Sequence, residues 1–117
     1  MKFRNDLTRR CYEFSLEILK LTDSLPQKRS SWIISDQLIR SATSIGANLI
    51  EGGSSCSRAE FKKFNEISLK SANETLYWLS LLNDAKLADH ETIAKLEKEA
   101  GDLCSMIAAG IIKLKGH

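Results

Sequence analysis

The segment Gly52–Ser57 reads GGSSCS and contains the small residues most suited to binding an anion. Glycines and serines before a helix can present backbone N–H groups to a phosphate. A Walker-type loop also needs Lys followed by Ser or Thr, however, and a dinucleotide-binding loop follows a strand. Neither condition is met. We therefore interpret the segment as a turn between helices, in which Gly52 or Gly53 adopts a left-handed conformation.

Cys56 is the residue of this turn whose type suits nucleophilic catalysis, because the start of a helix can lower the pKa of a nearby thiol. A nucleophile also needs a base, and the histidines are His90 and His117. In an antiparallel bundle His90 would lie at the opposite end from Cys56, so no catalytic pair and no enzyme activity are expected. No His-x-x-x-His or Glu-x-x-His pair is present either, so neither a metal site nor a cofactor is predicted.

Basic side chains are the other group that could bind a partner. The chain has 17 Lys and Arg against 15 Asp and Glu, and this net charge of +2 does not by itself indicate nucleic-acid binding. Repeating the chain in a ring would, however, produce rings of charge. A solvated surface charge is the alternative explanation for each of the candidate phosphate contacts, which are Arg4, Arg9, Arg10, Arg40, Arg58, Lys62 and Lys63.

Most carboxylates of the middle segments, such as Glu51 and Glu60, are interpreted as solvated or helix-capping groups. Glu74 is different, because pairing residues across the turn places it about one helical turn from Arg40. We expect an ion pair between these two side chains. A partly buried pair would specify the register of the helices more than it would stabilise them.

Four segments have the apolar periodicity of α-helices, and the predicted ranges are 6–24, 31–51, 58–84 and 90–114. No segment alternates as a strand does, and the connections are short. The predicted fold class is therefore all-α, an antiparallel up-down-up-down four-helix bundle. At 117 residues the chain is expected to form one domain over residues 1–117.

Local signals mark where these helices begin, end and approach one another. Pro26 ends the first helix, and Gly46, within a stretch of small residues, indicates close packing against another helix. Ser57 and Glu60 form the pattern of a capping box. The expected N-caps are Asp6 for the first helix, Ser30 or Ser31 for the second, Ser57 for the third and Asp89 for the fourth.

The third helix has more apolar residues than one bundle face requires. Leu69, Tyr77, Trp78 and Leu81 lie off its main stripe. An apolar surface of this kind typically marks an interface, so these four residues are the predicted contact between subunits.

Composition also bears on the compartment. No apolar run reaches the roughly 18 residues of a membrane span, so no membrane partner is expected. The charged N-terminus MKFRNDLTRR does not resemble a signal peptide. Cys11, Cys56 and Cys104 are odd in number and lack metal-type spacing, which is typical of proteins in a reducing cytoplasm.

The run QLIRSATSIGANLIEG, followed by SRAEFKKFNEISLKSANETL, resembles the bacterial four-helix-bundle family named for proteins encoded in 23S ribosomal RNA intervening sequences. The resemblance implies a homo-oligomer, with a ring of five subunits favoured, and no established enzyme activity. A distantly similar group, the retroelement accessory variability proteins, forms basic pentameric barrels that engage nucleic acid. The family-motif positions are Arg40, Asn48, Glu51, Gly52, Ser71 and Glu74.

The chain departs from the family pattern at two places. Ser54, Ser55 and Cys56 occupy a turn in which the family usually has a basic residue, which removes a charge that could bind nucleic acid. Ser68 and Lys70 replace the usual Ala and Gly, which makes a close approach of the third helix less favourable.

Together these observations predict a non-enzymatic, homo-oligomeric scaffold in the cytoplasm, with structured RNA as the candidate ligand. Contacts to RNA would be made to phosphates, because the sequence contains no aromatic signature of a base-reading module. The alternative is a protein–protein interaction module that has no nucleic-acid role.

Overall fold

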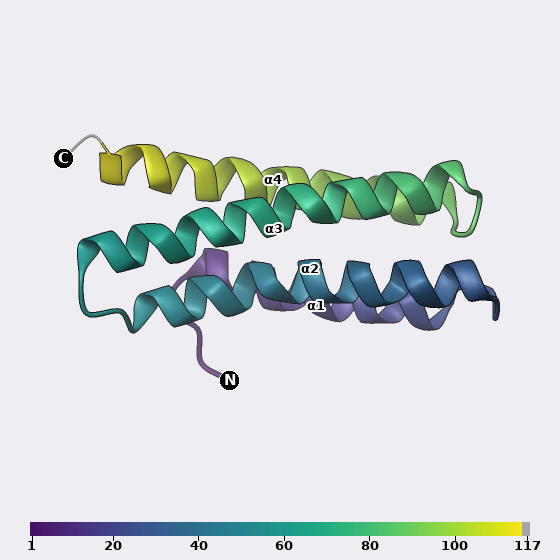
Figure 1. The fold of residues 1–117 in the computed structure, drawn as a ribbon, viewed down its shortest axis with the longest axis horizontal. Helices are drawn as coiled ribbons and strands as arrows, with labels where there is room; N and C mark the ends of the chain where they lie inside the picture. Colours follow the sequence, from purple (N-terminus) through teal and green to yellow (C-terminus); the bar gives the residue numbers. More distant parts are fainter. Residues whose placement is uncertain (116–117) are drawn as a thin grey trace.

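The computed structural model describes residues 1–115 and contains four α-helices within them. These are α1 (Asp6–Asp23), α2 (Arg29–Gly53), α3 (Arg58–Asp84) and α4 (His90–Lys115). Successive helices run in opposite directions (Figure 1). Helices α1 and α3 each pack against both α2 and α4. The predicted all-α, antiparallel four-helix bundle is confirmed.

The first helix begins with a capping box that the sequence analysis did not identify. Asn5 is the N-cap, its Oδ1 accepts a hydrogen bond from the Thr8 backbone N–H at 2.9 Å, and the Thr8 hydroxyl accepts from the Asn5 N–H at 3.4 Å. The prediction that Asp6 is the cap was therefore wrong by one residue. Asp6 lies instead in the first turn, where a negative charge interacts favourably with the helix dipole.

The second helix begins two residues before its predicted start, and neither Ser30 nor Ser31 caps it. Lys28 is the N-cap and makes no side-chain capping bond. Ser31 points into the protein instead, because it is only 1% exposed. Its hydroxyl has no hydrogen-bond partner among residues 1–115.

The predicted caps of the last two helices are confirmed. The Ser57 hydroxyl accepts a hydrogen bond from the Glu60 N–H at 3.1 Å, which is one half of the expected capping box. Asp89 Oδ2 accepts hydrogen bonds from the backbone N–H and the hydroxyl of Thr92, both at 3.0 Å. These two bonds, the backbone one first, lower the pKa of Asp89.

The turn between α2 and α3 does not use a left-handed glycine, contrary to the prediction. Gly52 and Gly53 both lie inside α2, which ends at the C-cap Ser54. A Cβ added to Gly52 would lie 2.9 Å from the Cβ of Phe64, so Gly52 allows α3 to approach closely. Within residues 1–115, positive φ occurs at Lys86, with φ of 58° in the turn between α3 and α4.

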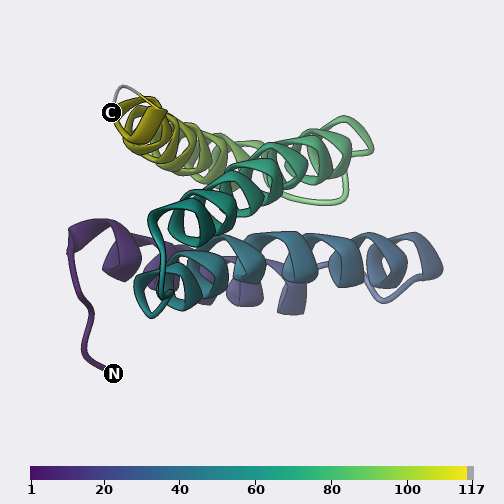
Figure 2. The same cartoon turned by 60° about the vertical axis from the view of Figure 1, so that its left-hand side comes forward.

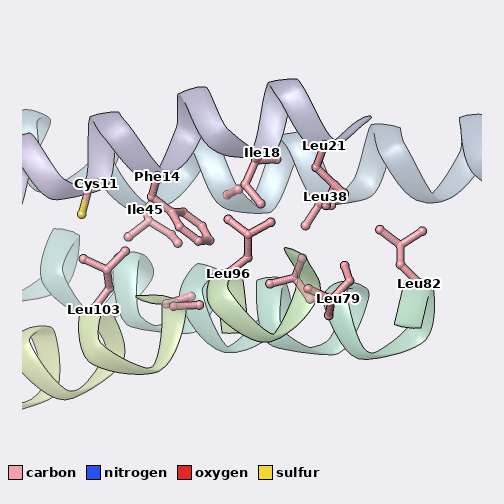
Figure 3. Packing of buried hydrophobic residues seen from close by; sticks show 14 of the residues in the cluster. Cys11, Phe14, Ile18, Leu21, Leu38, Ile45, Leu79, Leu82, Leu96 and Leu103 are labelled. Carbon is pink, nitrogen blue, oxygen red and sulfur yellow. The ribbon is translucent and has the colours of Figure 1, made fainter. Parts of the chain in front are cut away.

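The core lies between the α1–α2 and α3–α4 pairs. In Figure 3, Phe14 and Ile18 of α1 lie opposite Leu96 and Leu103 of α4, with side chains from all four helices filling the space. The predicted close packing at Gly46 is confirmed, because a Cβ there would lie 3.0 Å from the Cβ of Cys11.

Candidate nucleic-acid interface

Positive charge is concentrated at one end of the bundle. The N-terminal segment, the connection between α2 and α3, and the end of α4 meet at this end (Figures 1 and 2). Residues 1–9, 51–63 and 108–115, which we call the basic end, contain eight basic and three acidic residues, a net charge of +5. The whole chain carries +2, so the remaining residues carry −3. The basic residues are Lys2, Arg4, Arg9, Arg58, Lys62, Lys63, Lys113 and Lys115.

Helix dipoles do not account for this polarity. Helices α1 and α3 begin at the basic end, whereas α2 and α4 end there. Two positive and two negative helix termini therefore lie side by side, and their partial charges largely cancel. Side-chain charge determines the electrostatic potential at this end.

Four of the seven predicted phosphate contacts lie at the basic end without an acidic partner. They are Arg4, Arg58, Lys62 and Lys63, and none forms an ion pair of 4.0 Å or shorter with another residue among 1–115. Arg4 lies over the ring of Phe61, with its guanidinium carbon 5.6 Å from the ring centroid. Arg58 Nη2 donates to the carbonyl of Leu114 at 3.2 Å.

Arg4 and Arg58 line a hollow of about 410 Å³, which we call the end pocket, whereas Lys62 and Lys63 lie outside its lining. Its charged lining includes Lys113 of α4, a residue absent from the predicted contacts. Apolar side chains form most of the remaining walls, with Asn5 and Asn65 between them, and Leu49 is 1% exposed. The pocket therefore combines cations and apolar surface, its main lining residues being Arg4, Leu49, Arg58, Phe61, Lys113 and Leu114.

The other three predicted contacts lie elsewhere or are already paired. Arg9 forms ion pairs with Asp6 and Glu13. Arg10 binds Glu99 through two nitrogens, at 2.6 and 3.1 Å. This pairing raises the pKa of Arg10.

Arg10 is half-buried between α1 and α4, where it also lies 3.5 Å from Asp102. The structure therefore assigns it a contact between helices, whereas the sequence analysis treated it as a surface charge. Arg40 is exposed in the middle of α2 and forms no ion pair with Glu74, so that expected pair is not found within the described residues. Glu74 instead accepts a hydrogen bond from Trp78 Nε1 at 3.0 Å.

The family-motif serine Ser71 belongs to a line of hydroxyl contacts between α2 and α3. Ser71 donates to Ser44 at 2.9 Å, and Thr75 donates to Ser41 at 2.9 Å. Ser68 donates to the carbonyl of Ile45 at 2.7 Å and is fully buried. Ser68 therefore accompanies a close approach of α3 to α2, contrary to the expectation, because its hydroxyl forms a hydrogen bond between the two helices.

The remaining family-motif positions, Asn48, Glu51 and Gly52, lie in the second half of α2. Asn48 Nδ2 donates to both the backbone carbonyl and the hydroxyl of Ser44, at 2.8 Å each. Glu51 is exposed at the end of α2. Gly52 is buried against α3, as described above.

The predicted subunit-contact residues divide into two classes. Leu69 and Trp78 are half-buried and pack against the core of their own bundle. Tyr77 is 62% exposed and Leu81 is 36% exposed, which leaves an apolar patch on α3.

A second apolar surface lies between α1 and α2. It is a groove of about 510 Å³ whose lining includes Tyr12, Leu16 and Leu19 from α1 and Ala47 and Ile50 from α2. The three α1 side chains are each at least 40% exposed. Apolar periodicity did not predict this groove, because its α1 residues lie outside the core-facing stripe of that helix.

The thiols and histidines do not form a catalytic arrangement within the described residues. Cys56 is exposed in the α2–α3 turn, and His90 begins α4 at the opposite end of the bundle, where its Nδ1 lies 3.0 Å from Asn83 Oδ1. His117 lies outside the described residues.

Residues 1–115 contain no group of three or more His, Cys, Asp or Glu side chains placed to hold a metal ion. None of the four helices is long and apolar enough to cross a membrane.

Comparison with known proteins identifies a family. Residues 4–109 match the family described as 23S rRNA-intervening sequence protein. A solved structure described as a protein of unknown function from the S23 ribosomal protein family of Bacteroides thetaiotaomicron is 32% identical to the chain. The match has a TM-score of 0.85 and covers 90% of this chain and 97% of that one. Neither description names a catalytic activity. No curated protein matches the chain.

Proposed function

The chain belongs to the 23S rRNA-intervening sequence protein family, and on that premise we propose that it is a non-enzymatic, homo-oligomeric scaffold that holds structured RNA through its phosphates. The observation that carries this proposal is the basic end, with its eight basic and three acidic residues. Three free cysteines are consistent with a cytoplasmic location.

Phosphate contacts fit the basic end better than base recognition does. Most of its cations are on exposed side chains, and Lys and Arg in such positions neutralise phosphates without reading sequence. The end pocket, described above, is too small for a helical segment of RNA. A surface of this kind holds folded RNA by its charge and shape.

Two apolar surfaces that one bundle leaves uncovered support the oligomer. Tyr77 and Leu81 form a patch on α3, and the groove lies between α1 and α2. Because these surfaces belong to different helices, the patch of one subunit can fill the groove of the next. Head-to-tail contacts form a ring when the rotation between neighbouring subunits closes, and family resemblance favours a ring of five members.

A ring also strengthens the electrostatic argument. A single chain carries only +2, but a ring of like-oriented subunits places every basic end on the same side. The charges then act together on one long polyanion, and binding gains from multiple simultaneous contacts.

Salt-dependent RNA binding tests the proposal. We expect affinity for a structured RNA to fall steeply with added salt, with a log–log slope of about −0.9 for each phosphate neutralised. Replacing Lys62 and Lys63 together by Ala should weaken binding and flatten that slope. The matched control replaces Lys28 and Lys95, two exposed cations outside the basic end, and should change binding much less.

Two results would contradict the RNA proposal. One is a wild-type affinity at low salt no better than that of an unrelated protein of the same charge. The other is an equal loss of binding in both double variants, because the charge would then act without regard to position. The protein-interaction module would take its place, and the apolar groove is the observation that favours it.

A further inference from the structure

The end pocket has features that diffuse phosphate contacts do not need. We propose that it binds one nucleoside phosphate, with the phosphate held by Arg4, Arg58 and Lys113 and the base against Phe61. This inference rests on the proposed function where the nucleotide belongs to RNA. The same chemistry would bind a free mononucleotide, and the experiment below separates the two sources.

Three cations from separate parts of the chain converge on the pocket. Arg4 precedes α1, Arg58 begins α3, and Lys113 lies in the last turn of α4. None forms an ion pair with another residue among 1–115. Arg58 uses one nitrogen for the Leu114 carbonyl and keeps its other N–H donors available. An anion with several acceptor oxygens would satisfy these groups.

The rest of the lining is mainly apolar and aromatic, with Asn5 and Asn65 as its polar members. Leu49 closes the pocket from α2, and Leu114 and Phe61 form walls from α4 and α3. The volume of about 410 Å³ is within the range of small-molecule sites and much larger than a phosphate ion requires. A ligand that fills it therefore carries an apolar part as well as a negative charge.

A flat apolar group is the part that the aromatic side favours. The Arg4 guanidinium lies over the Phe61 ring at 5.6 Å, so a planar cation and an aromatic ring already lie together. Unpaired bases stack on both aromatic rings and guanidinium planes. A nucleoside phosphate supplies the base and the anion in one molecule. In RNA the nucleotide would come from a single-stranded loop or end, because a base within a duplex is not accessible.

The experiment measures binding of AMP, adenosine, inorganic phosphate and decanoate to the full chain by calorimetry. We expect AMP to bind at least tenfold more tightly than adenosine or phosphate alone. Replacing Arg4 and Arg58 together by Gln should weaken AMP binding by about tenfold or more, since hydrogen bonds to charged groups contribute strongly. Phe61→Leu should weaken it by roughly fivefold or more through loss of stacking.

A control at the same end separates this site from general charge. The Lys62→Gln/Lys63→Gln variant loses two cations outside the pocket lining, so it should retain AMP affinity while its RNA salt slope flattens. Arg4 and Arg58 are exposed, so their replacement tests binding without endangering the fold.

The outcomes distinguish this inference from the proposed function. AMP binding no tighter than phosphate, unchanged in the Arg4/Arg58 variant or equalled by decanoate overturns the pocket, even when RNA binding persists. Competition between AMP and a single-stranded oligoribonucleotide supports a nucleotide of RNA. AMP binding without that competition supports the pocket as a mononucleotide site separate from the RNA-binding surface, and the salt-dependent RNA measurement then decides the proposed function by itself.

Discussion

Serine stabilises a helix as its N-cap, but Ser31 lies past the N-cap of α2 and its side chain is buried. Its hydroxyl is buried without a partner among residues 1–115, and an unmade hydrogen bond of this kind costs about 1–3 kcal/mol. Ser31→Ala should therefore raise the free energy of unfolding by about 1 kcal/mol, measured by urea denaturation. Ser30→Ala, in the same turn but exposed, is the matched control. A loss of stability specific to Ser31→Ala would show that the hydroxyl is satisfied.

The three thiols differ in their surroundings and should differ in reactivity. Burial raises the pKa of Cys11 to about 12, and burial also raises the pKa of Cys104. Cys56 is exposed. Because the thiolate is the reactive form, iodoacetamide at pH 8 should modify Cys56 first and Cys11 only after unfolding, as measured by mass spectrometry. Cys56→Ser should leave stability and RNA binding unchanged, and a large specific loss of function would revive a thiol enzyme.

Asp89 should make the stability of the fourth helix dependent on pH. Its pKa in the folded state is lowered, mainly by the hydrogen bond from the Thr92 N–H. Its contribution is therefore complete above the unfolded pKa of about 3.9 and disappears as the pH falls through the lowered folded value. Asp89→Asn keeps an accepting oxygen without the charge, so its unfolding midpoint should vary less between pH 5 and pH 2. An identical pH profile in both proteins would contradict this.

Two glycines within helices test the packing of elements. A Cβ at Gly46 would lie 3.0 Å from Cys11 Cβ, whereas a Cβ at Gly101 would meet nothing within 4 Å. Gly46→Ala should destabilise the protein by about 1–3 kcal/mol because α1 must move away. Gly101→Ala should stabilise it by up to about 1 kcal/mol, through helix propensity alone. Thermal or urea unfolding measures both, and destabilisation of equal size would mean that helix contact does not explain Gly46.

Apolar periodicity was sufficient to predict the helices, whereas their exact ends depended on details that periodicity does not contain. Ser57 and Asp89 cap as predicted, because each side chain accepts a hydrogen bond from the backbone N–H three residues further on. Asn5 caps the first helix in place of the predicted Asp6, because its side chain and that of Thr8 bond reciprocally, and periodicity carries no information on this geometry. The hydroxyl hydrogen bonds between α2 and α3 were not predicted either, because the spacing of serines does not reveal which hydroxyls face each other.

At the scale of the whole molecule, the basic end could not be found by counting charge along the chain. Its cations come from three segments that the antiparallel topology brings together, and Lys113 in α4 lies 50 positions after Lys63 in α3. The prediction selected individual cations from sequence, and so included Arg10, which the structure pairs with Glu99. Charge must be mapped onto the bundle before a binding surface becomes visible.

The two uncovered apolar surfaces lead to a prediction about assembly. We expect light scattering at micromolar concentration to give a mass several times the 13.1 kDa of the chain, because these surfaces would otherwise remain exposed to water. Replacing Tyr77 and Leu81 by Lys should dissociate the assembly by charging the patch. Leu16→Lys together with Leu19→Lys should do the same by charging the groove. Ile112→Lys, at a residue that is 69% exposed outside both surfaces, is the control and should assemble normally.

Mixing the two double variants distinguishes a head-to-tail ring from other assemblies. The patch variant retains an intact groove, and the groove variant retains an intact patch, so one productive contact can form between them. Head-to-tail assembly therefore predicts a heterodimer in the mixture and monomers in each variant alone. If the patch instead binds the patch of a second copy, the groove variant forms a dimer on its own through its intact patch, and adding the patch variant creates no new contact. A monomeric wild type under these conditions would remove the homo-oligomer altogether and leave both surfaces for other proteins.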